Sequence, residues 1–237
     1  MIKRPGKRVT DILVLCGGEG RRLKSVVSDR PKPMADIKGR PFLDILIGHI
    51  ARQGFSRFIL CAGYKSEIIS RYYNDRSDSL DILISEEDKP LGTAGAIKNA
   101  QPLIRSGSFL VMNGDSFCAL NLSEFIRFHN DKGADFSVVL TKSDSESDCG
   151  VVSLDKSGKI TGFNEKIQAD KDGFLNAGIY LFNKEIFSFI EVEKKQSLEC
   201  NIFPKLIGAK FYGYVSNKGF TDIGTPDRYA KARKSLG

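Results

Sequence analysis

The sequence predicts an α/β fold in which helices flank a doubly wound, mostly parallel mixed sheet. Short apolar runs alternate with helical patterns along the chain, which is typical of strand–helix–strand units. A glycine-rich turn follows the first apolar run, where such folds connect a strand to a helix. The length of 237 residues suits one domain with a small lobe.

Residues 11–141 carry the pattern of a parallel sheet with its crossover helices. Strands are expected over residues 12–16, 57–62, 81–85, 108–112 and 136–141, which are apolar and rich in residues that favour strands. Helices are expected over residues 42–53, 66–74, 93–104 and 123–132. Gly54 marks the end of the first helix, because glycine is favoured just beyond a helix C-terminus.

Residues 142–237 have a different texture. A polar, acidic loop spans residues 143–148, and the turn at residues 155–158 predicts a hairpin. A further strand is expected over residues 174–182, and Thr225 with Pro226 predicts the cap and first residue of the last helix. We expect a single domain over residues 11–237, in which the halves 11–141 and 142–237 share one sheet.

Composition limits the partners and the location of the protein. The net charge is +7, but the cations are spread along the chain without a basic stripe, so no nucleic-acid partner is expected. No apolar run approaches the ~20 residues of a membrane span, so no membrane partner is expected. Residues 1–10 are basic without the apolar segment of a secretory signal, and we expect a flexible tail there. The five cysteines show no C-x-x-C spacing, so a zinc site is not expected. Their odd number fits a reducing, cytoplasmic location.

A glycine-rich turn and its neighbouring cations form the most specific motif in the chain. Glycines allow backbone N–H groups to wrap an anion, and arginine or lysine neutralises its charge. Gly20 is followed by arginine where a Walker loop needs lysine, and Leu23 stands where a dinucleotide fingerprint has glycine. The motif therefore predicts a different polyphosphate site. Its residues are Leu15, Gly17, Gly18, Gly20, Arg21, Arg22 and Lys32.

Two aspartates are candidate ligands for a metal ion. Asp115 follows the strand at residues 108–112, and Asp222 precedes the last helix. Ligands of open α/β sheets lie beyond the carboxyl ends of strands, and carboxylate oxygens suit Mg²⁺. Taken alone, either aspartate is also typical of a turn.

With these motifs, the chain resembles the sugar-1-phosphate nucleotidylyltransferases, also called NDP-sugar pyrophosphorylases. The motifs stand in the order of that family between Ile12 and Tyr229. Two residues depart from it: Arg21 stands where threonine is usual, and Phe220 where tryptophan is usual. The resemblance implies a Rossmann-like, GT-A-like nucleotidyltransferase fold, with a nucleotide-binding half at residues 11–141 and a sugar-binding half at residues 142–237. Family analogy also favours a homodimer.

The resemblance further implies a role for each matched residue. Catalytic roles are implied for Arg22, Lys32, Asp115, Lys166 and Asp222, with Asp115 and Asp222 as the Mg²⁺ ligands. Nucleotide binding is implied for Leu15, Gly17, Gly18, Gly20, Arg21, Glu87, Gly92, Thr93, Asn113 and Gly114. Sugar phosphate binding is implied for Glu165, Lys166, Asn176 and Gly178. Glu87 is the candidate for guanine recognition, and a solvated loop acid is its alternative.

Within the family, the short length and residues 24–34 look most like the D-glycero-α-D-manno-heptose 1-phosphate guanylyltransferases. The expected reaction joins GTP and this sugar 1-phosphate into an NDP-sugar and releases pyrophosphate, with Mg²⁺ as cofactor. Alternatives are a mannose-1-phosphate guanylyltransferase, a UTP-dependent uridylyltransferase, and a non-catalytic regulator that senses nucleotide sugars. A glycosyltransferase is disfavoured, because Asn113 stands where a D-x-D metal motif needs its first carboxylate.

Overall fold

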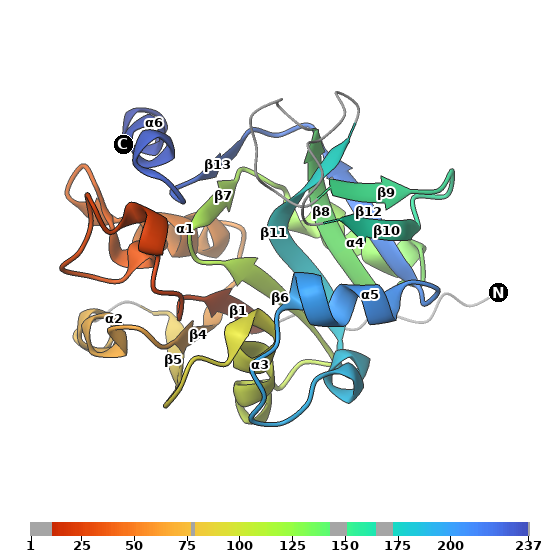
Figure 1. Ribbon diagram of the computed structural model, residues 1–237, viewed down its shortest axis with the longest axis horizontal. Helices are drawn as coiled ribbons and strands as arrows, with labels where there is room; N and C mark the ends of the chain where they lie inside the picture. The colour runs from red at the N-terminus through yellow and green to blue at the C-terminus, as the bar shows by residue number, and fades with distance from the viewer. Residues whose placement is uncertain (1–10, 77–78, 143–150, 165–172, 237) are drawn as a thin grey trace.

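The computed structural model describes residues 11–76, 79–142, 151–164 and 173–236 (Figure 1). The expected tail at residues 1–10, the expected acidic loop at residues 143–148 and the candidates Glu165 and Lys166 lie outside the described residues. Among the helices within these ranges, none has both the length and the apolar character needed to cross a membrane.

A nine-stranded sheet runs through the centre of the molecule (Figure 1). Four neighbouring strands are parallel, in the order β5-β4-β1-β6. They are β1 (Asp11–Leu15), β4 (Arg57–Ala62), β5 (Asp81–Glu86) and β6 (Ser108–Asn113). The strand order reverses between β1 and β6, which creates a topological switch point at their carboxyl ends, where open α/β sheets bind ligands.

The other five strands extend the sheet beyond β6. They are β8 (Phe136–Lys142), β9 (Val151–Leu154), β10 (Ile160–Asn164), β11 (Phe174–Asn183) and β12 (Phe211–Ser216). β11 is antiparallel to β6 and also pairs with β8 and β9. β12 is parallel to β8, and β10 pairs with β9. The β11–β8 register shifts between Asn176 and Tyr180, beside the carboxyl end of β6.

Two hydrophobic clusters cover opposite faces of the sheet, because successive side chains of a buried strand point to opposite sides. In β1, for example, Leu13 belongs to one cluster and Ile12 to the other. The first face is covered by α3 (Gly92–Asn99), α5 (Phe203–Leu206), and the short helices η4 (Lys184–Phe189) and η5 (Leu198–Ile202). The second face is covered by α1 (Phe42–Ala51), α2 (Ser66–Asn74) and α4 (Leu122–Asp131).

A third, smaller cluster joins the last helix, α6 (Pro226–Ser235), to the segment that follows the glycine turn. The short elements of that segment are η1 (Arg21–Leu23), η2 (Lys32–Met34), β2 (Asp36–Ile37) and β3 (Arg40–Pro41). A separate two-stranded ribbon pairs β7 (Ser116–Cys118) with β13 (Phe220–Asp222). In Figure 1 the ribbon lies between β6, which β7 follows, and α6, which β13 precedes.

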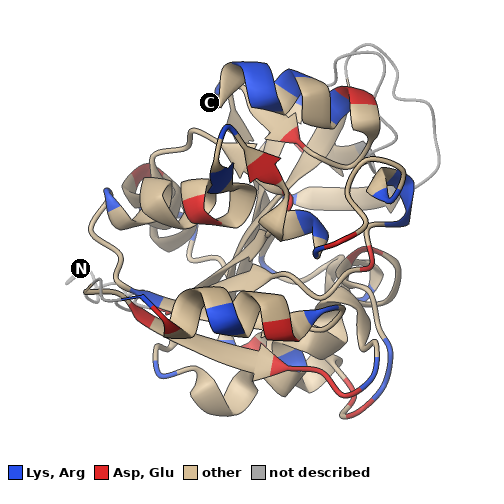
Figure 2. Cartoon of the chain, turned by 90° about the vertical axis from the view of Figure 1, so that its left-hand side faces the viewer, with Lys and Arg blue, Asp and Glu red and all other residues tan. Residues whose placement is uncertain are grey.

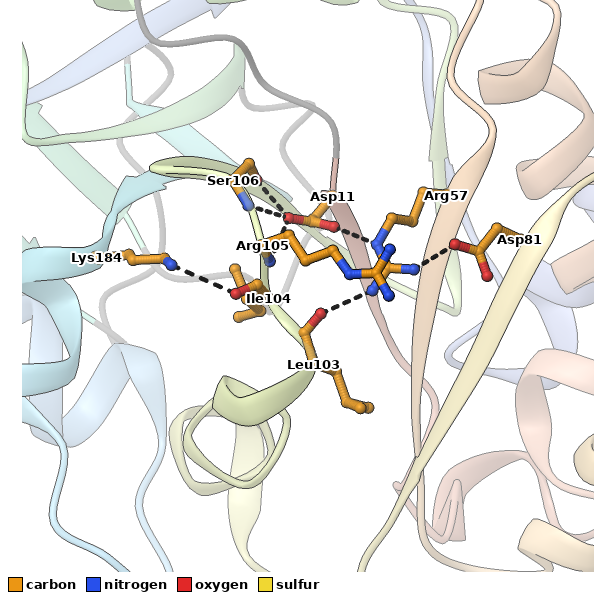
Figure 3. A network of polar contacts seen from close by, with 8 residues as sticks. All are labelled: Asp11, Arg57, Asp81, Leu103, Ile104, Arg105, Ser106 and Lys184. Carbon is orange, nitrogen blue, oxygen red and sulfur yellow. Dashed lines mark hydrogen bonds and ion pairs between the residues drawn. The ribbon is translucent and has the colours of Figure 1, made fainter.

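A buried ionic network ties together the amino ends of the parallel strands (Figure 3). The Asp11 carboxylate, which is 0% exposed, accepts hydrogen bonds from the backbone N–H groups of Arg105 and Ser106. The Ser106 hydroxyl and the Arg57 guanidinium also donate to it, at 2.6 and 2.7 Å. Arg57 further pairs with Asp81 and donates to the Leu103 carbonyl at 2.9 Å. Four segments are thereby joined at the edge opposite the switch point.

The predicted α/β class and its strands are confirmed, with ends that shift by at most one residue. The predicted helix over residues 93–104 is wrong in its second half: α3 ends at Asn99, and η3 (Gln101–Leu103) follows as a separate turn. Pro102 explains the break, because proline has no N–H to donate and clashes inside a helix. The last helix begins as predicted, with the Thr225 side chain accepting from the Arg228 N–H.

Charged residues of both signs are distributed over the face shown in Figure 2. Lys and Arg are most concentrated on α6, at the top of that view, which carries basic residues in its last turn. On this face the cations therefore follow one helix and several loops instead of one continuous stripe.

Candidate functional site

A cavity of about 680 Å³ lies at the switch point between β1 and β6. The segments that follow the carboxyl ends of β1, β4, β5 and β6 all contribute to its walls. The predicted site residues among its lining are Leu15, Gly17, Gly18, Gly20, Arg21, Lys32, Glu87, Gly92, Thr93, Asn113 and Asp115. Residues from five separate stretches of sequence thus meet around one hollow, as a ligand site in an open sheet requires.

The glycine turn packs closely against the residues around it. Gly20 has a φ of +61°, which favours glycine, and a Cβ at this position would lie 3.0 Å from the Cβ of Lys32. A Cβ on Gly17 would lie 3.2 Å from a Glu87 oxygen and 3.3 Å from the Gly63 nitrogen. The glycines therefore allow the loop to bring its backbone against a cation on one side and a carboxylate on the other.

Lys32 and Asp115 face each other across the cavity wall. The Lys32 Nζ lies 2.5 Å from the Asp115 Oδ2, and their side chains remain 17% and 28% exposed. Asp115 reaches this position because Gly114 passes very near β1, where a Cβ would lie 2.8 Å from the Leu15 carbonyl oxygen. Gly114 is thus explained by close backbone packing, and it does not line the cavity. The pair places one cation and one carboxylate where a bound polyanion would meet both.

Asp222 comes next to Asp115 through the β7–β13 ribbon. Asp222 pairs in register with Ser116, and the Ile223 N–H donates to the Asp115 carbonyl at 3.0 Å. The Asp222 carboxylate accepts from the Gly224 N–H at 2.8 Å and lies 3.4 Å from the Arg228 guanidinium. Two carboxylates on adjacent strands are suitable oxygen donors for a divalent cation. Within the described part of the chain, no group of three or more such ligands occurs.

Arg22 lies beside this same loop and not in the cavity lining. A Cβ on Gly224 would lie 3.5 Å from the Arg22 Nη2. Asp222 is also outside the lining. The structure therefore separates the predicted catalytic residues into Lys32 and Asp115 at the cavity, Arg22 and Asp222 beside it, and Lys166 outside the described residues.

Glu87 points its carboxylate toward the glycine turn. Its Oε2 accepts from the Leu91 N–H at 3.0 Å. Burial raises the pKa of Glu87, and this hydrogen bond lowers it in part, with a raised value as the result. Its proximity to Gly17 and Gly63 places a partly buried acceptor within the cavity, which favours a paired donor over the alternative of a solvated loop acid.

The glycines at the start of α3 are required by close packing against another segment of the chain. Gly92 has a φ of +71°, and a Cβ there would lie 2.5 Å from the Gln196 carbonyl oxygen. At Gly95 a Cβ would lie 2.9 Å from the Lys194 carbonyl oxygen. The segment at residues 194–196 therefore crosses α3 at backbone contact, and it brings Lys195 into the cavity lining. The Thr93 hydroxyl accepts from the Leu198 N–H at 2.7 Å.

Asn176 and Gly178 lie in the bulge of β11, beside the cavity and not in its lining. A Cβ on Gly178 would lie 2.5 Å from the Asn113 Nδ2, so the space at this glycine is filled by a side chain of this protein. The Asn176 Nδ2 donates to the Tyr180 hydroxyl at 2.8 Å, and the Asn176 Oδ1 accepts from the Gly178 N–H at 2.9 Å. The bulge is thus held by side chains from β6 and β11.

Several lining residues were not among the predicted site residues. Tyr64 and Gly63 follow the carboxyl end of β4, which is the signal that could have identified them. The ammonium groups of Lys24 and Lys65 lie 5.2 and 5.5 Å from the centroid of the Tyr64 ring. Lys195 has no such signal, because its segment carries no recognisable motif. The others are Cys16, Glu19, Pro33, Asp88, Lys89, Pro90 and Ala96.

Comparison with known proteins bears on this cavity. The model of the family described as "Nucleotidyl transferase" matches residues 12–237. D-glycero-alpha-D-manno-heptose 1-phosphate guanylyltransferase of Aneurinibacillus thermoaerophilus is 37% identical over 95% of this chain and 98% of its own. Mannose-1-phosphate guanylyltransferase of Mycobacterium tuberculosis is 32% identical over 95% of this chain and 64% of its own.

A solved structure shares both the sequence and the fold. HddC from Yersinia pseudotuberculosis is 35% identical, covers 97% of this chain and 100% of its own, and superposes with a TM-score of 0.86. The same protein complexed with GMP-PN gives a TM-score of 0.85. The predicted family resemblance and fold are confirmed by these matches.

Proposed function

This chain belongs to the nucleotidyl transferase family, and on that premise we propose that it transfers the guanylyl group of GTP to a sugar 1-phosphate. The favoured acceptor is D-glycero-α-D-manno-heptose 1-phosphate, and the products are the GDP-sugar and pyrophosphate. The acceptor is inferred from the similarity to the Aneurinibacillus guanylyltransferase, which covers nearly the full length of both chains. The nucleotide is inferred from that name and from the GMP-PN complex of HddC.

The observation that carries the proposal is the placement of the Lys32–Asp115 pair beside the glycine turn, at the switch point of the sheet. The sugar phosphate oxygen is already an anion, so this reaction needs no base to activate it. The barrier arises mainly from bringing two polyanions together in line. A cation beside N–H-rich backbone lowers that barrier by positioning and by neutralising charge.

The groups around the cavity each lie where they suit one part of the nucleotide. The N–H groups at Gly17–Arg21 suit the β- and γ-phosphates, with Arg22 at the edge of the same loop. Lys32 suits the α-phosphate because its ammonium lies at the cavity wall, beside Asp115. Glu87, Gly92 and Thr93 line the cavity from the segment that follows β5, and they suit the base and ribose. Two guanine donors, N1–H and N2–H₂, match the two oxygens of a carboxylate such as Glu87.

The chemistry of Asp115 and Asp222 fits Mg²⁺, since both offer hard oxygen donors on adjacent strands. When bound, Mg²⁺ would supply charge neutralisation for the phosphates. In the described structure, both carboxylates pair with cations of the protein itself, Lys32 and Arg228. These cations hold the two carboxylates in place near the glycine turn.

We assign the sugar 1-phosphate to the bulge of β11, which lies beside the cavity and contains Asn176, and to Lys195, which lines the cavity. Glu165 and Lys166 are implied in the same role by the family motif. In the transfer step, an oxygen of the sugar phosphate forms a bond to the α-phosphorus. The bond to the bridging oxygen breaks, and pyrophosphate leaves with that electron pair.

The proposal is tested by pyrophosphate release from purified protein with Mg²⁺, over a grid of the four common NTPs and several sugar 1-phosphates. Release with GTP and D-glycero-α-D-manno-heptose 1-phosphate, and with no other pair at a comparable rate, is the expected result. Release with GTP and mannose 1-phosphate would keep the mechanism and replace the acceptor. Release with UTP alone would overturn the guanylyl assignment, and silence across the grid would overturn the enzymatic proposal.

A further inference from the structure

We propose that Glu199 is a positioning residue, which acts through Tyr180 to hold the nitrogen end of the Asn176 amide in place and thereby raises the affinity for the sugar 1-phosphate. This inference deepens the proposed function and rests on it. Glu199 lies outside the cavity lining and belongs to none of the motifs that predicted the site. Its contacts nevertheless link the sugar side of the cavity to its nucleotide side.

Glu199 sits on η5, a single turn of π-helix that covers one face of the sheet. π-Helical turns are rare, and they frequently occur at functional sites. The Glu199 Oε1 accepts from the Tyr180 hydroxyl at 3.1 Å, and its Oε2 accepts from the Ser197 hydroxyl at 2.8 Å. Both carboxylate oxygens are therefore engaged, which holds the side chain in one orientation.

The hydrogen bonds between Glu199, Tyr180 and Asn176 run in one direction. An ionised carboxylate only accepts, so the single proton of the Tyr180 hydroxyl is donated to Glu199. The phenol oxygen can then only accept, and the Asn176 Nδ2 donates to it at 2.8 Å. At its other end, the amide oxygen accepts from the Gly178 N–H, which can only donate, at 2.9 Å. The Gly178 N–H therefore holds the oxygen of the Asn176 amide, while Glu199, through Tyr180, holds its nitrogen.

Tyr180 links Glu199 to Asn176 through a hydroxyl that is fixed in place and stays protonated. Its side chain is fully buried, and burial together with the nearby Glu199 charge raises the pKa of its hydroxyl well above the usual value. The phenol therefore keeps its proton at neutral pH. Asn176 retains one N–H donor and one acceptor lone pair, which match the donor and acceptor character of a sugar hydroxyl.

The nucleotide side is linked to Glu199 more weakly. The Thr93 hydroxyl lies 3.4 Å from the Glu199 Oε2, while it accepts from the Leu198 N–H at 2.7 Å. Loss of Glu199 therefore leaves Thr93 with its stronger partner. This asymmetry predicts that a Glu199 variant loses sugar phosphate affinity and keeps its affinity for the nucleotide.

The test compares Glu199→Ala, Glu199→Gln and the wild type in steady-state pyrophosphate release, with each substrate varied in turn. We expect Glu199→Ala to raise KM for the sugar 1-phosphate about tenfold, as loss of one fixed hydrogen bond does, and to leave KM for GTP within about twofold. Glu199→Gln should have a smaller effect, because its amide oxygen can still accept from Tyr180. Glu185→Gln, at an exposed glutamate of the same half, is the matched control and should change neither KM.

A double-mutant cycle separates positioning from a general structural effect. Asn176→Ala alone should raise KM for the sugar 1-phosphate, and adding Glu199→Ala should then raise it little further, because both act on one amide. Equal rises of both KM values, or additive effects in the cycle, would overturn this inference alone. A wild-type protein that releases no pyrophosphate with any substrate pair would instead overturn the proposed function.

Discussion

Each end of the parallel sheet carries a carboxylate paired with a cation, but the two carboxylates differ in burial and in their number of hydrogen bonds. At the amino ends, the Asp11 carboxylate is fully buried and accepts four hydrogen bonds, from Arg57, Arg105 and twice from Ser106 (Figure 3). At the carboxyl ends, Asp115 is 28% exposed and accepts from Lys32 and from the Ser116 hydroxyl. One carboxylate is saturated, and the other retains room for further partners.

The difference separates what stabilises the fold from what binds a ligand. A buried charge is tolerated only when its hydrogen-bonding capacity is satisfied. Losing any hydrogen-bond partner of Asp11 would therefore lower the stability of the protein. A partly exposed pair costs little to rearrange, so Lys32 and Asp115 can change partners when a polyanion arrives. The comparison predicts that substitutions at the two ends act on different measurements.

The largest effect on stability is expected for Asp11→Asn. The substitution removes the buried charge that Arg57 pairs with, and its amide NH2 must face either Arg57 or the N–H groups of Arg105 and Ser106. Breaking one side of a buried pair costs about 3–5 kcal/mol of unfolding free energy, measurable by urea denaturation. The turnover number should equal that of the wild type at temperatures where the variant is folded. A loss of turnover in the folded variant would break the separation between the two ends.

The same variant has a pH signature. Burial opposes ionisation of Asp11, but the hydrogen bonds from Ser106, Arg57 and Arg105 outweigh it and lower the pKa of Asp11 below the usual 3.8. A carboxylate with a lowered pKa stabilises the protein above its usual pKa, and this contribution is lost as the pH falls through the lower folded value. The stability gap between wild type and Asp11→Asn should therefore narrow below about pH 4. A gap that stays constant from pH 7 to pH 3 would contradict this account.

A change of similar size, but in rate, is expected for Asp115→Asn. Loss of one electrostatic contact in a preorganised site lowers turnover about 10²–10³-fold. The unfolding free energy should fall by less than about 1 kcal/mol, because the pair is partly exposed. Pyrophosphate release and urea denaturation of the same preparation check both parts. Asp88→Asn, an exposed carboxylate of the same cavity, is the control and should keep wild-type turnover.

Glu87→Gln should change nucleotide selection more than turnover. Replacing a charged acceptor for two guanine donors should raise KM for GTP about ten- to hundredfold. The glutamine variant should also be more stable at neutral pH. A carboxyl with a raised pKa contributes stability below its usual pKa and loses it as the pH rises through the folded value, so ionised Glu87 opposes folding at pH 7. Glu86→Gln, at the neighbouring residue, should leave nucleotide selection unchanged, and an equal effect there would reject the role of Glu87.

The smallest effect is expected for the exposed pair of Asp29 and Arg30. The Asp29 side chain is 65% exposed, and its Oδ2 accepts from the Arg30 Nη2 at 2.6 Å. Exposed pairs of this kind contribute about 0–1 kcal/mol, so Asp29→Asn should hardly move the urea midpoint. A loss as large as that of Asp11→Asn would mean that burial does not explain the difference between the pairs.

Local signals predicted most of the sheet and the centre of the site. The apolar runs that became β1, β4 and β6 are buried on both faces, so their composition alone marked them as central strands. The glycine turn and Asp115 were found because they directly follow such strands, and Lys32 because of its spacing from the glycine turn. Position after a strand is a local property, and in an open α/β sheet it places residues at the ligand edge.

Contacts between distant segments could not be predicted in the same way. The sequence has no signal for the parallel pairing of β12 with β8 or for the place of β11 beside β6. Nor does it show that residues 194–196 cross Gly92 and Gly95 at backbone contact. The link from Glu199 to Asn176 depends on the same long-range packing. Such contacts are decided by how whole elements stack.

The most direct test of the contrast between the two ends is the turnover of Lys32→Ala, measured by pyrophosphate release in a preparation whose urea midpoint is recorded. Lys32 is one half of the cavity pair, and its ammonium lies 2.5 Å from Asp115. The account predicts a loss of about 10²–10³ in turnover with a nearly unchanged midpoint. Turnover within about threefold of the wild type would contradict it, because removal of one preorganised charge contact could not then matter to the chemistry.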